Sequence, residues 1–203
     1  DTATEFRLQA VQHRLDRIDA IVYTHAHADH ILGLDDMRIV AERMQQQIPV
    51  YGTEETMARI RHMFGYAFEQ RLWRSELTRL RAEFINGDFD VHWLRFEPVP
   101  ILHDNMIVNG YRFADVAYVT DVSYIPPESM EKLTGLKLLI ISAIRFKPHP
   151  KHMAVDEVLG TIEKLKPERA LITHISHELE HSEFDRYCPE NVSPAYDGLT
   201  IEL

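Results

Sequence analysis

The sequence predicts a mixed α/β fold in which helices cover β-sheets, and three observations lead to this class. Short apolar, β-branched runs are bounded by polar turns, as strands are. Strands dominate early, and strands alternate with helical patterns toward the carboxyl end. Histidines and aspartates gather where predicted strands end, which is where α/β folds place their sites.

Size and composition indicate one globular domain over residues 1–203, with 45% hydrophobic and 27% charged residues. No apolar run approaches the roughly 18 residues of a membrane helix, and no secretory signal is present. Cys188 is the only cysteine, which excludes an internal disulfide and favours a cytoplasmic location. The net charge of -10 argues against an extended nucleic-acid surface. Because the chain starts at Asp1 without a methionine, we expect upstream residues to be missing.

The first half of the chain shows the hydrophobic spacing of both helices and strands. The patterns predict a strand at 17–23, a helix at 34–46, a strand at 48–51 and a helix at 53–63. Residues 64–84 are amphipathic, and six arginines lie between Arg59 and Arg81. This stretch is either a lid for an anionic substrate or a solvated helix pair, and the second reading is favoured. Its aromatic residues are expected in the core or at a homodimer contact: Phe64, Tyr66, Phe68 and Trp73.

In the second half of the chain, predicted strands and helices alternate more regularly. The patterns there predict strands at 91–96 and 99–102, a hairpin at 106–113, a strand at 117–120, a helix at 126–133, a strand at 136–142, a helix at 155–165, a strand at 170–173 and an edge strand at 199–203. The hairpin turn is placed at Asn109-Gly110, because this pair suits the two positive-φ positions of a type I′ turn.

The most specific signal is the loop Thr24-His25-Ala26-His27-Ala28-Asp29-His30, directly after the first predicted strand. Imidazole suits metals such as zinc, and carboxylate oxygen suits harder ions such as manganese. So short a loop cannot easily direct four donors at one ion. We therefore expect His25 and His27 to bind one ion, and Asp29 and His30 to bind a second.

Two ions need further ligands, and the later strand ends offer His103, Asp121 and His174. A carboxylate at Asp121 could bridge ions held about 3.5–4 Å apart, as two-metal hydrolases require. Each of these residues also has a structural reading. His103 alone is more often an ordinary core or surface histidine, and Asp121 alone could cap a turn.

At this point the sequence resembles the metallo-β-lactamase superfamily, whose signature is His-x-His-x-Asp-His after a strand. It also resembles one branch, the PhnP-like cyclic-phosphate phosphodiesterases. The shared stretches span nearly the whole chain: Gly33 to Arg38, Phe64 to Phe68, Gly110 to Phe113, Tyr118 to Asp121, Arg145 to His152, Leu171 to His177 and Pro194 to Leu199. The resemblance implies a four-layer αβ/βα sandwich that here lacks its N-terminal strands, about fifty residues in such proteins.

The resemblance also implies roles for individual residues. The first ion would be held by His25, His27 and His103, and the second by Asp29, His30 and His174, with Asp121 bridging. The family often has glycine where this chain has Asp104. Zinc or manganese is expected, and iron also suits the ligand set.

A catalytic role is implied for His152, which falls where these branches place a non-ligand histidine, and it would protonate the leaving oxygen. Its structural alternative is an exposed neighbour of the helix start. Asp29 would also orient the attacking water. Candidates for substrate contact are His149, His177, Arg38 and Arg145, although the two arginines could instead form structural ion pairs.

The leading functional prediction is a binuclear phosphodiesterase that attacks a small cyclic phosphate or nucleotide-like phosphodiester with a metal-bridged hydroxide. One alternative is a tRNA 3′-endonuclease, which needs a flexible Gly- and Pro-rich basic arm that the sequence does not show. Another is a thioesterase or lactamase of the same superfamily, which would share the metal motif. A non-enzymatic metal-binding module is the remaining alternative, and the complete ligand set argues against it.

Overall fold

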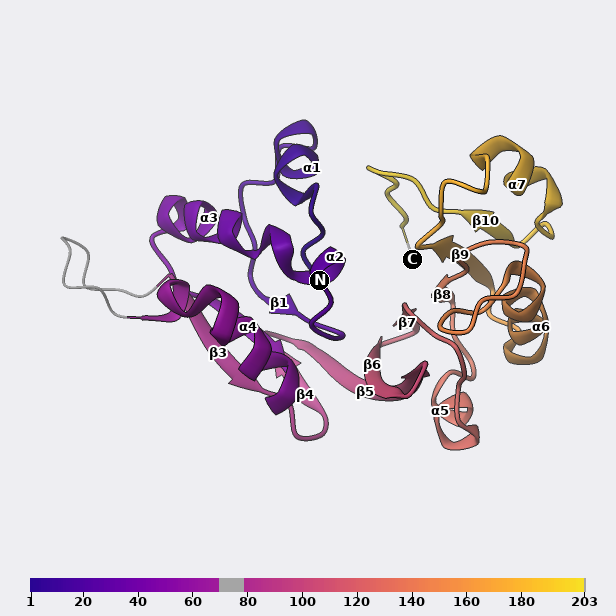
Figure 1. Ribbon diagram of the computed structural model, residues 1–203, viewed down its shortest axis with the longest axis horizontal. Helices are drawn as coiled ribbons and strands as arrows, with labels where there is room; N and C mark the ends of the chain where they lie inside the picture. The colour runs from indigo at the N-terminus through magenta and orange to yellow at the C-terminus, as the bar shows by residue number, and fades with distance from the viewer. Residues whose placement is uncertain (70–78, 203) are drawn as a thin grey trace. The chain divides into compact units, whose positions relative to one another are not determined.

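The computed structural model describes residues 1–69 and 79–202, and the chain forms two compact units, Asp1–Val91 and His92–Leu203. Each unit has its own apolar core and is described by itself. The elements of the two units are labelled in Figure 1. The single domain predicted over residues 1–203 remains a prediction.

The first unit is built on three parallel strands in the order β1-β2-β3. Their bounds are β1 (Ile21–Val22), β2 (Ile48–Gly52) and β3 (Leu80–Phe84). The helices of this unit are α1 (Phe6–Gln12), α2 (Ala28–Ile31), the 3₁₀ helix η1 (Leu32–Asp36), α3 (Met37–Met44) and α4 (Glu54–Phe68), and β4 (Phe89–Val91) is its last strand. Helix α4 runs alongside β3 (Figure 1).

Helix α4 forms where the sequence predicts a capped amphipathic helix. The Thr53 hydroxyl accepts a hydrogen bond from the backbone N–H of Thr56 at 3.2 Å, which satisfies one of the unpaired amides of the first turn. Met57, Ile60 and Phe64 are buried at helical spacing against the strands. The helix thereby covers the sheet that carries the histidine loop.

A close backbone approach attaches the start of the chain to the histidine loop. The Thr2 N–H donates to the carbonyl of His30 at 2.7 Å, and the Gly33 N–H donates to the carbonyl of Thr2 at 3.1 Å. A Cβ at Gly33 would lie 2.4 Å from the Ala3 carbonyl oxygen and 2.7 Å from the Phe6 Cβ. Only glycine therefore fits here without displacing backbone.

The second unit contains a mixed sheet whose strands follow the order β10-β9-β8-β7-β6-β5. The strands are β5 (Leu94–His103), β6 (Met106–Phe113), β7 (Val116–Val119), β8 (Leu138–Ser142), β9 (Arg169–Thr173) and β10 (Val192–Pro194), and the helices are α5 (Pro127–Lys132), α6 (Val155–Leu165) and α7 (His181–Tyr187). Pairing is parallel from β7 to β10 and antiparallel between β5, β6 and β7.

This topology places three strand ends at one edge of the sheet, called the rim below. Strands β7, β8 and β9 are parallel, so their carboxyl ends meet there. Strand β5 is antiparallel to β6, which is antiparallel to β7, so β5 also ends at the rim. The Ser123 N–H donates to the carbonyl of Leu102 at 2.7 Å and fastens the end of β5 to the turn after β7.

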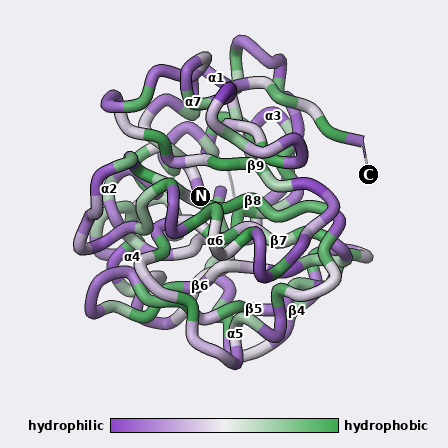
Figure 2. Tube along the Cα trace, turned by 90° about the vertical axis from the view of Figure 1, so that its right-hand side faces the viewer, coloured by the Kyte–Doolittle hydropathy of each residue, from purple (hydrophilic) through white to green (hydrophobic). Residues whose placement is uncertain are grey.

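The core of the second unit is continuous across this sheet. Strand β8 is buried at four of its five positions, and Figure 2 shows apolar colouring along β8 and β9. Helix α6 buries Val155, Val158 and Ile162 at helical spacing. Its first amide is capped, because the Ala154 N–H donates to Oε2 of Glu157 at 2.7 Å.

Three of the predictions about strands are wrong. The strands predicted separately at 91–96 and 99–102 are joined in one strand, β5. Asn109 and Gly110 do not form a turn but lie inside β6, opposite Pro100 and Val99. Gly110 is needed for close packing, because a Cβ there would lie 2.9 Å from the Tyr118 carbonyl oxygen. The last strand of the sheet is β10 at Val192–Pro194 and not the predicted segment 199–203. Leu199 of that segment instead packs against the apolar cluster of Val116, Leu138 and Leu171. Residue 203 lies outside the described residues.

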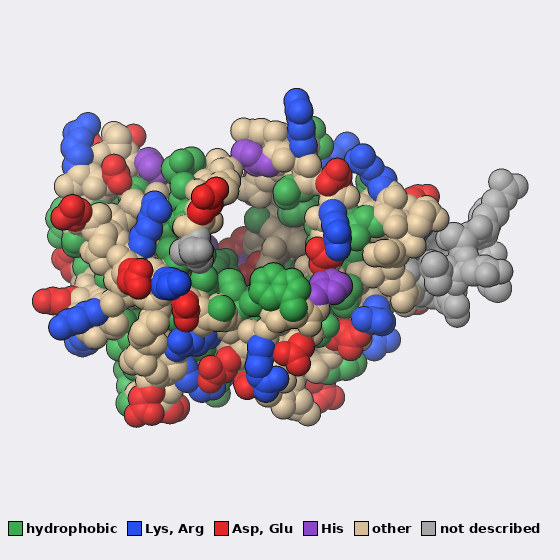
Figure 3. Space-filling view, turned by 180° about the vertical axis from the view of Figure 1, so that it is seen from behind, with side chains coloured by type: hydrophobic (Ala, Val, Ile, Leu, Met, Phe, Trp, Pro, Cys, Tyr) green, Lys and Arg blue, Asp and Glu red, His purple; other side chains and the backbone are tan. Residues whose placement is uncertain are grey.

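The arginine-rich stretch lies partly outside the described residues, since 70–78 with Trp73 are not described. Three of its four described arginines pair with acidic side chains: Arg59 with Glu55 at 3.4 Å, Arg79 with Glu42 at 3.2 Å and Arg81 with Glu83 at 2.7 Å. Figure 3 shows basic and acidic side chains intermixed on the molecular surface. These pairs agree with the solvated face of the predicted helix pair, but the prediction of a second helix is wrong at 80–84, which form strand β3.

The aromatic residues of this stretch divide between core and surface. Phe64 is buried and Phe68 packs against the same core. The Tyr66 ring is partly exposed, and its hydroxyl donates to Oδ1 of Asp35 at 2.6 Å. Over the described residues, no helix is long and apolar enough to cross a membrane.

We expect Gly33→Ala to destabilise the protein by about 2 kcal/mol, because the new methyl group must displace the backbone of Ala3. Urea unfolding measures this change. The matched control is Gly160→Ala within α6, where a Cβ meets no atom within 4 Å. That substitution should be neutral or stabilise by up to about 1 kcal/mol. Equal effects of the two substitutions would contradict the close-approach argument.

Candidate metal centre

The histidine loop of the first unit joins β1 to the short helix α2. Helix α2 places Asp29 in its first turn and His30 in its last, and the His30 N–H donates to the carbonyl of His27 at 3.0 Å. His25 and His30 are buried, whereas the Asp29 side chain is 58% exposed. A buried strand followed at once by a single helical turn therefore concentrates four donors in one place.

Asp1 orients two of these imidazoles. Its Oδ2 lies 2.8 Å from Nδ1 of His30 and accepts from the Thr24 hydroxyl at 2.8 Å. Its Oδ1 accepts from the Thr24 N–H at 2.8 Å. The Thr24 oxygen lies 3.0 Å from Nδ1 of His25. Since the Thr24 proton is directed at Asp1, that oxygen is left to accept from His25.

These contacts select the tautomers of His25 and His30. A carboxylate accepts only, so the Nδ1 of His30 carries the proton. The same reasoning places a proton on Nδ1 of His25. In both rings Nε2 then presents an electron pair, which is the state that a metal ligand requires.

The donor atoms of the first unit make two close contacts, and their assignment to two ions stays a prediction. His25 Nε2 lies 2.9 Å from His27 Nδ1, and Asp29 Oδ2 lies 3.5 Å from His30 Nε2. Nitrogen ligands at about 2.0–2.1 Å from one zinc ion are themselves about 3 Å apart. His25 with His27, and Asp29 with His30, therefore suit shared cations.

In the second unit, Asp121 lies between two histidines at the rim. Its Oδ1 is 2.8 Å from Nε2 of His174, and its Oδ2 is 3.7 Å from Nε2 of His103. The carboxylate is 2% exposed. A buried carboxylate is costly unless it is paired or binds a cation. One oxygen for each imidazole is the arrangement expected of a ligand shared by two ions.

The ring of His103 is fixed by the loop that follows Arg145. Its Nδ1 lies 2.9 Å from the carbonyl oxygen of Lys151, which can only accept. The proton therefore resides on Nδ1, and Nε2 faces Asp121 with an electron pair. This is the same tautomer as in His25 and His30.

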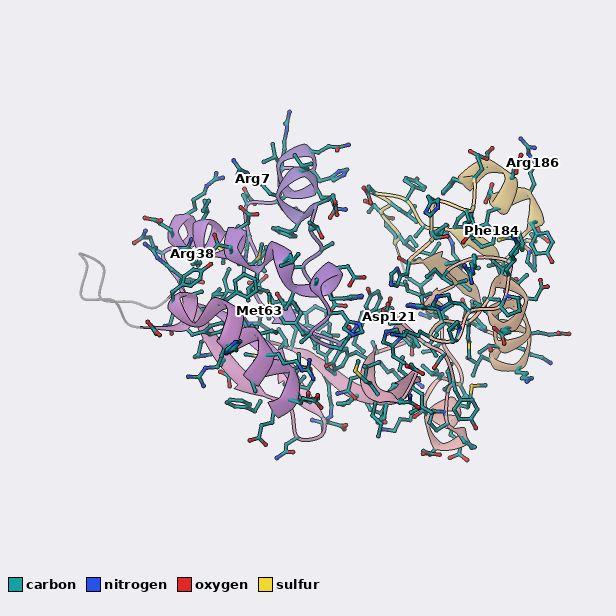
Figure 4. All side chains as sticks on the ribbon, in the orientation of Figure 1. Arg7, Arg38, Met63, Asp121, Phe184 and Arg186 are labelled. Carbon is teal, nitrogen blue, oxygen red and sulfur yellow. The ribbon has the colours of Figure 1, made fainter. Side chains whose placement is uncertain are left out.

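Backbone strain accompanies the ligand candidates at the rim. Asp121 has φ of 57° and His174 has φ of 56°, and Asp104, directly after His103, has φ of 56°. Non-glycine residues in this left-handed region cost on the order of 1–3 kcal/mol, and such strain concentrates at functional sites. Figure 4 shows Asp121 at the opposite side of the unit from Arg186 of α7.

His152 lies among the rim histidines although it is not placed as a ligand. Its ring centroid is 4.8 Å from that of His103 and 5.2 Å from that of His174. It is buried, so the structural alternative of an exposed neighbour of the helix does not hold. Burial lowers the pKa of His152 to about 4. Its Nδ1 makes no hydrogen bond to any described residue.

The four substrate-contact candidates occupy different settings. His149 is next to His152, with ring centroids 5.1 Å apart, and burial together with Arg145 lowers its pKa. His177 is exposed in the turn after β9. Arg38 donates twice to the Asp35 carboxylate, at 2.8 and 2.9 Å, and Arg145 donates to Glu178 at 3.0 Å. Both arginines thus form the structural ion pairs that the sequence left open.

Asp1 is a contact of the candidate ligands that the sequence did not indicate. No spacing rule connects it to Thr24 or His30, because its contacts depend on the return of the chain beside the histidine loop.

Comparison with known proteins identifies the family. A sequence profile of the beta-lactamase superfamily domain matches residues 1–175. The chain belongs to this family. Its member structures include a diphosphatase from the PhnP family, which is 40% identical, has a TM-score of 0.92, and is matched over 100% of this chain and 78% of that one. The predicted superfamily, the PhnP-like resemblance, the α/β fold and the assignment as a metal-dependent hydrolase are confirmed.

More distant superfamily structures share the fold alone. Human short-form tRNase Z has a TM-score of 0.75 at 16% identity, over 100% of this chain and 86% of that one. Zinc-bound PqqB from Methylobacterium extorquens has a TM-score of 0.75 at 13% identity, over 100% of this chain and 82% of that one. A curated relative, named octanoyltransferase, from Porphyromonas gingivalis is 31% identical over 98% of this chain. The chain spans only 41% of that protein.

We expect Asp121→Asn to weaken metal binding by about 100-fold or more, because the amide loses the charge that offsets a cation. Elemental analysis after dialysis measures the retained metal. The control is Asp104→Asn, an exposed neighbour whose N–H donates to the Ser123 hydroxyl at 3.0 Å. It should retain metal as the unmodified protein does. Undiminished metal in the Asp121 variant would contradict its role as a ligand.

Proposed function

We propose that this chain is a binuclear metal-dependent phosphodiesterase that hydrolyses a small cyclic phosphate or nucleotide-like phosphodiester. The observation that carries the proposal is Asp121, buried with one carboxylate oxygen toward His174 and the other toward His103. A residue placed in this way could supply one oxygen to each of two ions, and a two-metal site stabilises both the attacking and the leaving oxygens of an in-line displacement.

The proposed ligand sets are those that the family resemblance implies. One ion would be held by His25, His27 and His103, and the other by Asp29, His30 and His174, with Asp121 shared. Nitrogen-rich ligands with two carboxylates suit zinc or manganese, and iron is compatible. When bound, two such ions lower the pKa of a coordinated water and polarise a phosphoryl oxygen.

The protein residues would divide the remaining work. Asp29 is 58% exposed, so its carboxylate can accept a proton from the attacking water while it remains near His30. The buried His152 imidazole, whose Nδ1 has no partner among the described residues, can supply a proton to the leaving oxygen once the negative charge of a bound phosphate raises its lowered pKa. His149, in the same loop as His152, can contact the phosphate.

The choice of a phosphate ester over an acyl substrate is supported by the 40% identity to the PhnP-family diphosphatase. The same observation favours a second candidate, a diphosphate linkage, in which the leaving group is a phosphate. Both reactions place a departing oxygen where His152 can protonate it. We further propose that the substrate is a small molecule and that no extended nucleic acid is a partner. A cytoplasmic location is also proposed, and a homodimer is compatible with this function.

The expected substrate selectivity is tested with metal-loaded protein. We expect turnover of bis(p-nitrophenyl) phosphate or of a nucleoside diphosphate ester, and none of a β-lactam or a thioester. The ratio of the two phosphate activities decides between the phosphodiester and diphosphate candidates. Hydrolysis of the thioester alone would instead favour an acyl substrate, and no phosphate hydrolysis with zinc, manganese or iron would overturn the proposal.

We expect His152→Ala to retain its metal and to lose about 100-fold or more in kcat, because a positioned proton donor contributes a factor of this order. The control is His62→Ala, an exposed histidine on α4. Steady-state kinetics and elemental analysis of both variants provide the measurement. Activity within a few-fold of the unmodified protein would show that His152 does not protonate the leaving group.

A further inference from the structure

The guanidinium of Arg145 connects two loops of the second unit. Its Nε donates to the carbonyl of Lys147 at 3.2 Å, and its Nη2 donates to the carbonyl of Pro148 at 3.1 Å. On its other side, Nη1 donates to Oε1 of Glu178 at 3.0 Å. The side chain of Arg145 is only 29% exposed. We call these three contacts the Arg145 clasp.

Both connected loops carry residues of the proposed centre. The first loop continues from Pro148 through His149 to His152, and its Lys151 carbonyl holds the ring of His103. The second loop follows His174 and reaches Glu178 through Ser176, whose N–H donates to the carbonyl of Ile144 at 3.1 Å. The clasp can therefore affect His103, His152 and His174 through the two loops that it connects.

Near the clasp, the first loop is otherwise held by the Phe146 ring, which packs edge-on against Tyr187 of α7 with centroids 4.8 Å apart. Residues 146–152 form no helix or strand. The Lys151 N–H donates to Nδ1 of His149 at 3.2 Å, a contact within the loop itself. Regular pairing resumes at Met153, whose N–H donates to the carbonyl of Val122 at 2.7 Å. The position of residues 147–152 thus depends on the clasp and the Phe146 contact at one end, on the Lys151–His103 hydrogen bond, and on Met153 at the other end.

We propose that Arg145 is a positioning residue: its clasp fixes the loop that places His152 against the leaving oxygen. This inference rests on the proposed function. Arg145 is therefore not assigned to substrate binding, because its guanidinium donates to two carbonyls and a carboxylate. A planar guanidinium can meet three acceptors in fixed directions, whereas a lysine ammonium cannot reproduce that geometry.

The chain provides a matched control in Arg112. Its guanidinium also holds backbone, with Nη1 donating to the carbonyls of Lys132 at 2.6 Å and Thr134 at 2.9 Å. It lies at the end of β6 away from the rim, since Met106 pairs with His103 whereas Arg112 pairs with Glu97. Six residues of strand separate the two ends, about 20 Å. Arg112→Lys therefore removes a similar contact without a path to His152.

The experiment compares Arg145→Lys with Arg112→Lys in metal-loaded protein, using two readouts. Hydrogen exchange detected by mass spectrometry reports the backbone of residues 147–153. Kinetics with methyl phenyl phosphate and methyl p-nitrophenyl phosphate report proton donation, because the more basic phenolate needs the proton more. We expect Arg145→Lys to accelerate exchange in this segment. It should also lower kcat about tenfold for the phenyl ester and less than about threefold for the nitrophenyl ester.

A third variant tests the partner in the clasp. Glu178→Ala should act in the same direction, and the double variant with Arg145→Lys should lose no more than Arg145→Lys alone, because both act through one contact. Arg112→Lys should leave both readouts of the rim unchanged.

Three results would overturn the inference. Unchanged exchange in residues 147–153 would show that the clasp does not hold the loop. An equal fall in kcat for both esters would show that Arg145 has only a general structural role. Unchanged kcat for both esters would show that the loop position does not matter to proton donation. Failure of the proposed function is separate, because it would appear as inactive unmodified protein while the exchange readout still decides whether the clasp holds.

Discussion

The buried carboxylate of Asp121 is the constraint on which the rim of the second unit depends. Its two oxygens face His103 and His174, and the side chain is 2% exposed. Holding an anion away from water is costly unless positive charge is supplied. Two neutral imidazoles cannot supply it, because a neutral ring carries no net charge. The burial that disfavours the carboxylate anion therefore favours cation binding.

Orientation by outer hydrogen bonds is repeated across both units. Asp1 sets the ring of His30, the Thr24 oxygen sets that of His25, and the Lys151 carbonyl sets that of His103. Each contact places the proton on Nδ1 and directs Nε2 inward. Such partners raise the basicity of a ligand and fix its direction. The same imidazole tautomer is thus selected in each of the two units.

Membership of the beta-lactamase superfamily explains why a strand end and a single helical turn carry this loop, but it does not choose a substrate. That choice belongs to loops such as 146–152, which carry His149 and His152. The curated relative includes more than half of its length beyond the matched part, so its printed activity belongs to that whole protein. The PhnP-family diphosphatase, matched over this entire chain, is the more informative comparison.

The sequence by itself determined the fold class and the superfamily, because these depend on local spacing and on a strongly specific motif. It misplaced the turn at Asn109-Gly110, because the packing of Gly110 against Tyr118 overrides local turn preference. It left the roles of Arg38 and Arg145 open, because their partners become visible only after folding. Tertiary structure alone decided the contacts of Asp1 and of the Arg145 clasp. Both join segments far apart in the chain, and no local pattern encodes such a pairing.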